Sequence, residues 1–229
     1  LKVLEEAGIP IDYIAGTSMG SLVGALYAIG YDAHTMDSLV RRQNWTFLLS
    51  DKVYRYNLPF SEKEETEKYL VSVPIKNNRE IKIPSGFISG QNIYNLFSDL
   101  TIGYHDSLDF KKLPIPFACV ASNLVDGKEV VQDRGVLPLA MRASMAIPGA
   151  FAPVRKNGMV LVDGGISNNF PVDLAKAMGA DIIIGVDVQA ELKDASGLES
   201  VMGILDQMTY FLGIQKYEEN KKMVNIYIK

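Results

Sequence analysis

The alternation of apolar and polar positions over the first 30 residues predicts a helix, a strand and a second helix. Residues 1–8 have the apolar spacing of a helix, which then meets Gly8 and Pro10, two residues that end helices. The apolar run 11–15 predicts a short buried strand, and residues 21–29, rich in Leu, Val and Ala, predict a helix. A strand between two helices is typical of an α/β sheet protein.

The second half of the chain continues this alternation around longer apolar runs. Strands are predicted at 117–123 and 128–132, joined through Asp126-Gly127, a strong hairpin signal. The run 181–188 is almost continuously apolar, which is typical of a strand buried on both faces. We therefore expect a three-layer α/β/α fold, with an open, mostly parallel central sheet and helices on both of its faces.

Further helices and strands are predicted from the same periodicities, and the apolar face of each helix is expected in the core. They are a helix capped by Ser89 with apolar positions Ile93, Leu96, Phe97 and Leu100; a helix at 137–145; a strand at 160–162; a helix from Pro171 to Gly179; a helix with apolar positions Val201, Ile204, Leu205 and Met208; and a strand at 223–228.

Residues 45–88 differ from the rest because they are charged and interrupted by prolines. Within them, Ser61 and Glu64 resemble a capping box, and residues 69–83 resemble a hairpin that turns at Asn77-Asn78. We interpret 45–88 as an inserted cover over the core of one domain that spans residues 1–229.

Composition and charge exclude several classes of function. The chain has 229 residues, 48% hydrophobic and 22% charged, as expected for an ordinary globular domain. Its net charge of −4 argues against nucleic acid as a partner. The single cysteine, Cys119, excludes an internal disulfide framework and a multi-cysteine zinc site, and its apolar neighbours indicate a buried small side chain. No apolar run reaches the length of a transmembrane helix.

Both ends of the chain look cut. The helix at 1–8 has no N-terminal capping residue and no strand before it, and the strand at 223–228 ends the sequence. We expect an upstream element outside this sequence, and we leave the cellular location and the oligomeric state open.

The pattern G-x-S-x-G lies between the first strand and the second helix, as Gly16-Thr17-Ser18-Met19-Gly20. In this position it predicts a sharp turn that lifts the Ser18 hydroxyl off the sheet edge as a nucleophile. Gly16 and Gly20 are expected to remove Cβ atoms where the turn packs tightly. The helix that follows points its free N–H groups at the serine, where an oxyanion would develop.

A serine nucleophile needs a proton acceptor, and Asp163 is the preferred candidate. It ends a predicted strand, and Gly164 and Gly165 after it allow a sharp turn. In a parallel sheet, the strand ends that carry Ser18 and Asp163 would share the carboxyl edge. The two histidines, His34 and His105, lie in polar segments and are interpreted as surface residues, which leaves a Ser-His-Asp triad weakly supported.

Together these blocks resemble the patatin-like phospholipases. The resemblance is carried by the serine motif at 16–20, by Asp163-Gly164-Gly165, by the block 142–153, which is similar to a segment common in bacterial members, and by the run 163–187. It implies hydrolysis of phospholipid or lysophospholipid acyl esters at a lipid surface by a Ser-Asp dyad, through an acyl-enzyme and without a metal or other cofactor. Ser18 corresponds to the nucleophile and Asp163 to the general base.

The chain departs from the family pattern in one respect. Members carry a glycine-rich loop that supplies oxyanion-hole N–H donors, just upstream of the helix that here begins at Leu1. The Met19 N–H is the donor expected within this chain, and loss of one donor costs about 10²–10³ in rate. We expect severe impairment if the sequence is the whole molecule. A histidine-based esterase, thioesterase or peptidase and a lipid-binding module that has lost catalysis stay open as alternatives.

Overall fold

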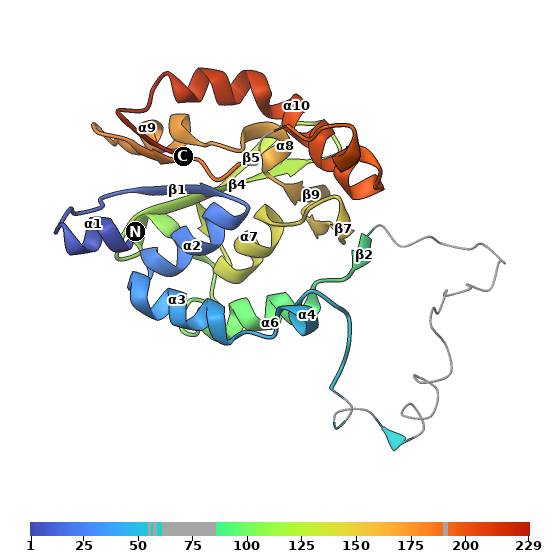
Figure 1. The fold of residues 1–229 in the computed structure, drawn as a ribbon. Helices are drawn as coiled ribbons and strands as arrows, with labels where there is room; N and C mark the ends of the chain where they lie inside the picture. The colour runs from blue at the N-terminus through green and yellow to red at the C-terminus, as the bar shows by residue number, and fades with distance from the viewer. Residues whose placement is uncertain (55, 57–58, 61–85, 190–191) are drawn as a thin grey trace.

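A mixed sheet of five strands lies at the centre of the protein, with helices on both of its faces (Figure 1). The computed structural model describes residues 1–54, 56, 59–60, 86–189 and 192–229. The strands of this sheet are β1 (Ile14–Thr17), β4 (Phe117–Asn123), β5 (Glu129–Gln132), β8 (Val154–Lys156) and β9 (Met159–Asp163). The expected three-layer α/β/α class is confirmed. The central sheet was expected to be mostly parallel, but among the described residues only the β1–β4 pairing is parallel and the other three pairings are antiparallel.

Strand β4 organises the sheet, because three strands pair with it. β1 runs parallel to residues 117–120 of β4, and β9 runs antiparallel to residues 121–123. β5 pairs antiparallel with residues 119–122, overlapping both partners, so it must lie on the opposite edge of β4. β1 and β9 therefore share one edge of β4, and their carboxyl ends point toward each other.

The sheet brings Ser18 and Asp163 together in a different way from the expected shared edge of a parallel sheet. The two residues follow or end strands that run in opposite directions, so they do not share the carboxyl edge of a parallel sheet. Thr17, the last residue of β1, pairs with Val120, and Ser18 follows it. Asp163, the last residue of β9, pairs with Ala121, the next residue of β4. Adjacent positions on β4 set their separation.

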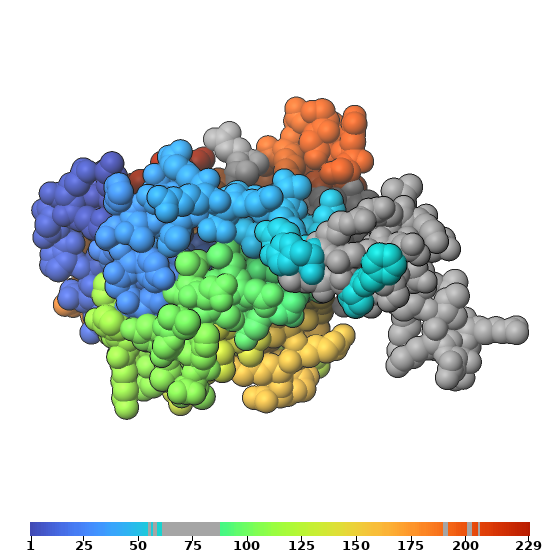
Figure 2. All heavy atoms as spheres, turned by 90° about the horizontal axis from the view of Figure 1, so that it is seen from below, coloured from blue at the N-terminus to red at the C-terminus, as the bar shows by residue number. Residues whose placement is uncertain are grey.

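The helices form two layers. On one side of the sheet lie α2, α3, α4, α6 and α7, and on the other lie α8, α9 and α10 (Figure 1). Seen from below, atoms of the N-terminal helices and of the α6 region lie side by side and cover the sheet (Figure 2). The helices are α1 (Lys2–Glu6), α2 (Met19–Ala28), α3 (Ala33–Arg42), α4 (Trp45–Leu48), α6 (Gln91–Leu100), α7 (Leu137–Ser144), α8 (Gly165–Asn168), α9 (Val172–Met178) and α10 (Val201–Lys221), with short 3-10 turns η2 (Phe110–Lys112) and η3 (Ser196–Leu198).

Three short strand pairs lie outside the central sheet. β2 (Gly86–Ile88) pairs in parallel with β7 (Gly149–Phe151), β3 (Leu108–Asp109) pairs antiparallel with β6 (Arg134–Gly135), and β10 (Ile184–Val186) pairs in parallel with β11 (Ile226–Ile228).

The run 181–188 does not form a strand buried on both faces, so that prediction is wrong. Only residues 184–186 are strand, and Ile182, Val186 and Val188 are exposed. Within the described chain β10 pairs only with β11, and residues 181–189 line an open cleft. A long apolar run therefore does not prove two-sided burial.

The main core lies between the sheet and the layer that contains α2, α6 and α7. Phe110, Phe117 and Met141 are fully buried there, and Ile93 and Phe97 of α6 face it as expected. The helix at 91–100 is capped by Gly90 rather than Ser89, because Gly90 adopts a φ of +79° that favours glycine.

The isolated cysteine is also buried. Cys119 is inaccessible to solvent, which confirms its interpretation as a small buried side chain. Burial raises the pKa of its thiol to about 12.

Two further expectations concern the cover and α10. In the segment 45–88, α4 and β2 are described, whereas the capping box at Ser61 and Glu64 and the hairpin at 69–83 lie outside the described residues. Ile204 and Met208 of α10 were expected in the core, but they are exposed.

In the described parts of the chain, no helix combines the length and apolarity needed to cross a bilayer.

Candidate active site

Ser18 lies at a tight turn between β1 and α2 and has a backbone conformation that few side chains adopt. Its φ is 51° and its ψ is −119°, which costs free energy for a residue other than glycine. The Ser18 N–H donates to Ser144 Oγ at 3.0 Å, and the Ser144 hydroxyl donates to the Val120 carbonyl at 2.6 Å. These bonds hold the turn against β4 in the strained conformation that the G-x-S-x-G pattern predicts.

The Ser18 hydroxyl donates a hydrogen bond to Asp163. The distance from Ser18 Oγ to Asp163 Oδ2 is 2.5 Å, and Asp163 Oδ1 accepts the Gly165 N–H at 2.8 Å. Asp163 is only 6% exposed. Burial raises the pKa of its carboxyl to about 6, even though the bonds from Ser18 and Gly165 favour the charged form.

The glycines of the two motifs do not all act in the same way. A Cβ on Gly16 would lie 2.4 Å from the Gly20 carbonyl oxygen, and one on Gly164 would lie 2.3 Å from the Val120 carbonyl oxygen. A Cβ on Gly165 would approach Asn169 Oδ1 to 3.0 Å. A Cβ on Gly20 would meet nothing within 4 Å, so the expectation of tight packing there is wrong.

We predict opposite effects on stability for alanine at the two ends of the serine motif. Gly16→Ala forces a clash with backbone and should lower the free energy of unfolding by about 1–3 kcal/mol or more. Gly20→Ala lies in α2 without a clash and should raise it by about 0.5–1 kcal/mol. Urea unfolding of both variants measures the difference. Equal destabilisation by the two changes would contradict this account of the turn.

The segment 144–146 at the end of α7 bridges both halves of the site. Ser144 Oγ accepts the Ser18 N–H, the Ser144 carbonyl accepts the Gly164 N–H at 3.3 Å, and the Ala146 carbonyl accepts the Asp163 N–H at 3.0 Å. Residue patterns alone did not single out Ser144. Its only signal was its place in the block 142–153.

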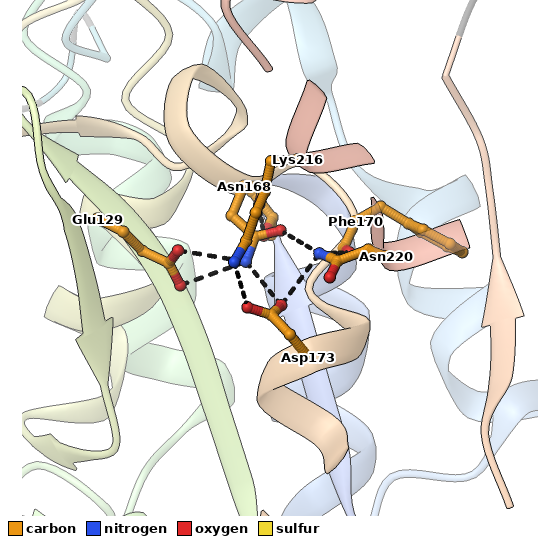
Figure 3. Close-up of polar contacts among 7 residues, drawn as sticks. Glu129, Asn168, Phe170, Asp173, Lys216 and Asn220 are labelled. Carbon is orange, nitrogen blue, oxygen red and sulfur yellow. Dashed lines mark hydrogen bonds and ion pairs between the residues drawn. The ribbon is translucent and has the colours of Figure 1, made fainter. Parts of the chain in front are cut away.

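A buried polar network secures the turn that follows Asp163 (Figure 3). The Asn168 side chain donates to Glu129 and Asp173, and its backbone carbonyl accepts the Thr17 hydroxyl at 2.8 Å. Asn220 of α10 donates to the side chains of Asn168 and Asp173. The network therefore ties the residue before Ser18, helix α8 and helix α10 together.

The outer members of this network carry charge. Lys216 of α10 forms an ion pair with Asp173 at 2.6 Å. Burial raises the pKa of the Glu129 carboxyl. The network is next to the dyad, and the contacts it makes position α8 and α10.

Neither histidine forms a hydrogen bond with Ser18. Both are exposed, and His105 Nε2 lies 2.7 Å from the Ser98 carbonyl oxygen. The Ser18 hydroxyl instead contacts Asp163. Among the described residues, no cluster of three or more potential metal ligands occurs.

Ser18 opens into a cleft of about 1570 Å³. The N–H groups of Met19 and Gly20, at the start of α2, have no hydrogen-bond acceptor among the described residues. They lie beside the serine, and the positive end of the helix dipole is directed at the same place.

In this α/β protein, a serine at a strand–helix turn is bonded to a buried carboxylate and lies next to free N–H groups, an arrangement that suits a nucleophilic serine. The chain belongs to the patatin-like phospholipase family. The family model described as "Patatin-like phospholipase" matches residues 1–176.

Similar curated proteins include lysophospholipases. The chain is 30% identical over 188 residues to "Lysophospholipase NTE1" of Phaeosphaeria nodorum and 31% identical over 188 residues to the protein named "Lysophospholipase nte1" in Aspergillus fumigatus, covering 82% of this chain and 11% of each relative. It is 30% identical over 194 residues to "Patatin-like phospholipase domain-containing protein 6" of Homo sapiens, covering 83% of this chain and 12% of that protein.

The chain thus spans about a tenth of the length of these relatives. They are fungal and mammalian, and they give no support to a restriction of the resemblance to bacterial members.

Proposed function

We propose that this protein is a serine acyl hydrolase that cleaves fatty-acyl esters of phospholipids or lysophospholipids. The observation that carries the proposal is the 2.5 Å hydrogen bond from the Ser18 hydroxyl to the buried carboxylate of Asp163. Membership of the patatin-like phospholipase family and similarity to proteins named lysophospholipases support the choice of substrate class.

In the acylation half of the reaction, ionised Asp163 accepts the Ser18 proton while Ser18 Oγ bonds to the ester carbonyl carbon. The tetrahedral intermediate carries its negative charge on the former carbonyl oxygen. It collapses when the bond to the alcohol oxygen breaks and Asp163 returns the proton to that oxygen. The products are a free alcohol and an acyl ester on Ser18, and Asp163 is again ionised.

Deacylation repeats these steps with water. Asp163 removes a proton from a water molecule, whose oxygen attacks the acyl carbon, and it then returns the proton to Ser18 Oγ as the ester bond breaks. A fatty acid leaves, and the Ser18–Asp163 hydrogen bond forms again. Each half-reaction needs Asp163 first as a base and then as an acid, a task suited to a carboxyl whose pKa is raised to about 6.

The oxyanion of both intermediates needs hydrogen-bond donors. The Met19 N–H is the donor we assign within this chain, because it follows the nucleophile and has no acceptor among the described residues. The α2 dipole adds a favourable field at the same place.

We also infer that residues 1–229 belong to one catalytic domain with 45–88 as an inserted cover. The support is that the helices before and after this segment, α2, α6 and α7, pack into one hydrophobic core.

Fatty-acid release from lysophosphatidylcholine tests the proposed function, and its pH dependence tests the role of Asp163. The base must be ionised, so kcat/KM should rise about tenfold per pH unit below pH 6 and level off above it. The measurement is a titration of free fatty acid between pH 4 and pH 8. The absence of release at any pH would refute the hydrolase, and a flat profile would refute the general base.

A further inference from the structure

Helix α10 has an unusual distribution of residues over its N-terminal part. The side that faces the protein carries Gly203 and Gly213, both buried. The side that faces solvent carries an apolar stripe at i, i+4, i+7 and i+8 spacing. Its members, with their exposed fractions, are Ile204 (44%), Met208 (54%), Phe211 (55%) and Leu212 (67%). A surface helix normally has the opposite pattern, with apolar residues inward.

The C-terminal part of the same helix is ordinary, which makes the apolar stripe a local feature. There Tyr217 and Asn220 are buried, and Gln215, Glu218 and Glu219 face solvent. The exposed apolar side chains therefore end at Leu212. If α10 were simply apolar all along its length, exposed apolar side chains would continue beyond Leu212, and they do not.

The apolar stripe ends at Leu212, next to Gly213, which packs against the candidate active site. A Cβ on Gly213 would lie 3.0 Å from the Gly165 carbonyl oxygen, which places α10 directly against the turn that follows Asp163. Gln207 and Tyr210, between the residues of the stripe in sequence, line the cleft into which Ser18 opens. Figure 1 shows α10 along the outer side of its helical layer.

The size of the stripe discriminates between two occupants. Its four side chains expose roughly 450 Å² in total, within the range of a single functional patch on a monomer. A stable dimer buries about 800 Å² on each partner, nearly twice that area. A bilayer has no such threshold, because each apolar side chain that enters it contributes separately.

We infer that the apolar stripe of α10 is the surface by which this protein rests on a phospholipid bilayer, with the cleft that contains Ser18 beside the membrane. This inference rests on the proposed function, because it supplies the reason for a lipid surface at the rim of the site. The net charge of −4 favours zwitterionic lipid over anionic lipid.

Flotation of the full chain with phosphatidylcholine vesicles tests this inference without requiring catalysis. The test variant combines Met208→Gln, Phe211→Gln and Leu212→Gln. A matched control combines Val3→Gln, Val53→Gln and Ile102→Gln, three exposed apolar residues on α1, after α4 and after α6 that do not line the cleft. The wild type should float with the vesicles, the α10 variant should bind at least tenfold more weakly, and the control should stay within twofold of the wild type.

Activity assays and sedimentation complete the test. Hydrolysis of monomeric p-nitrophenyl butyrate should be unchanged in the α10 variant, whereas hydrolysis of vesicle phospholipid should fall with binding. Failure of the wild type to float, or equal binding by the α10 variant, would overturn the inference even if the enzyme is active. A wild-type dimer that the α10 variant converts to monomer would also overturn it, because a second copy would then cover the stripe. Vesicle binding without any ester hydrolysis would support the surface and refute the proposed function.

Discussion

Ser18→Ala is expected to lower kcat for lysophospholipid hydrolysis by at least about 10⁴-fold, because loss of a nucleophile in serine hydrolases costs that much or more. The substitution removes only Oγ, while the Ser18 N–H bond to Ser144 and the turn between β1 and α2 are retained. The fold should therefore be preserved, and the melting temperature should fall only by the loss of one hydrogen bond to Asp163. Fatty-acid release under single-turnover and steady-state conditions measures the effect.

Two controls separate this result from the alternative functions. A fluorophosphonate probe should label the wild type at Ser18 and should not label Ser18→Ala. A variant with both His34→Ala and His105→Ala should keep turnover near the wild-type level, since both histidines are exposed and the Ser18 hydroxyl contacts Asp163. Loss of activity in the histidine variant would favour a triad, and a wild type that binds lipid but resists the probe would favour a binding module.

The sequence was sufficient to select Ser18 and Asp163, the two side chains that we propose to react, because both are marked by local patterns. Gly16 permits the turn before Ser18, and Gly164 permits the turn after Asp163, and in each case a Cβ would collide with a backbone oxygen. Ser144 has no comparable mark. Its role depends on the approach of α7 to β1, across 126 residues of chain, and no local spacing encodes that contact.

The errors in the fold have a similar origin. Periodicity identifies which positions are apolar, but it does not identify what lies beside them. Val186 and Met208 are apolar residues in a strand and a helix as expected, yet β10 borders an open cleft and the N-terminal part of α10 exposes its apolar side chains. The direction of β9 relative to β4 is likewise set by tertiary pairing, so the Ser18–Asp163 contact was predicted correctly from an incorrect sheet geometry.

Asp163→Asn is expected to abolish turnover and, above pH 6, to stabilise the protein. The amide cannot accept the Ser18 proton, so kcat should fall at least about 10⁴-fold. The same change removes a buried charge. Burial raises the pKa of Asp163 from 3.8 to about 6, so the carboxylate form is disfavoured in the folded state.

The sign of the pH dependence follows from the direction of this shift. Because the folded state binds the Asp163 proton more tightly than the unfolded state does, protonated Asp163 contributes to the free energy of unfolding. This contribution is fully present below pH 3.8 and is lost as pH rises through about 6. A shift of about two units corresponds to a stability difference on the order of 3 kcal/mol at pH 8. The amide of the Asp163→Asn variant does not titrate, so the variant should exceed the wild type by that order at pH 8 and match it near pH 4.

Urea unfolding of both proteins at pH 4 and pH 8 measures this difference. The amide oxygen can still accept the Gly165 N–H, and the amide nitrogen can donate to Ser18 Oγ, so the hydrogen bonds at the site have replacements. A gain that appears at pH 8 and vanishes at pH 4 would show that the protein holds its base at a cost in stability. If the wild type and the Asp163→Asn variant have equal free energies of unfolding at pH 4 and also at pH 8, Asp163 is solvated in the folded state. The general-base assignment would then lose its physical support.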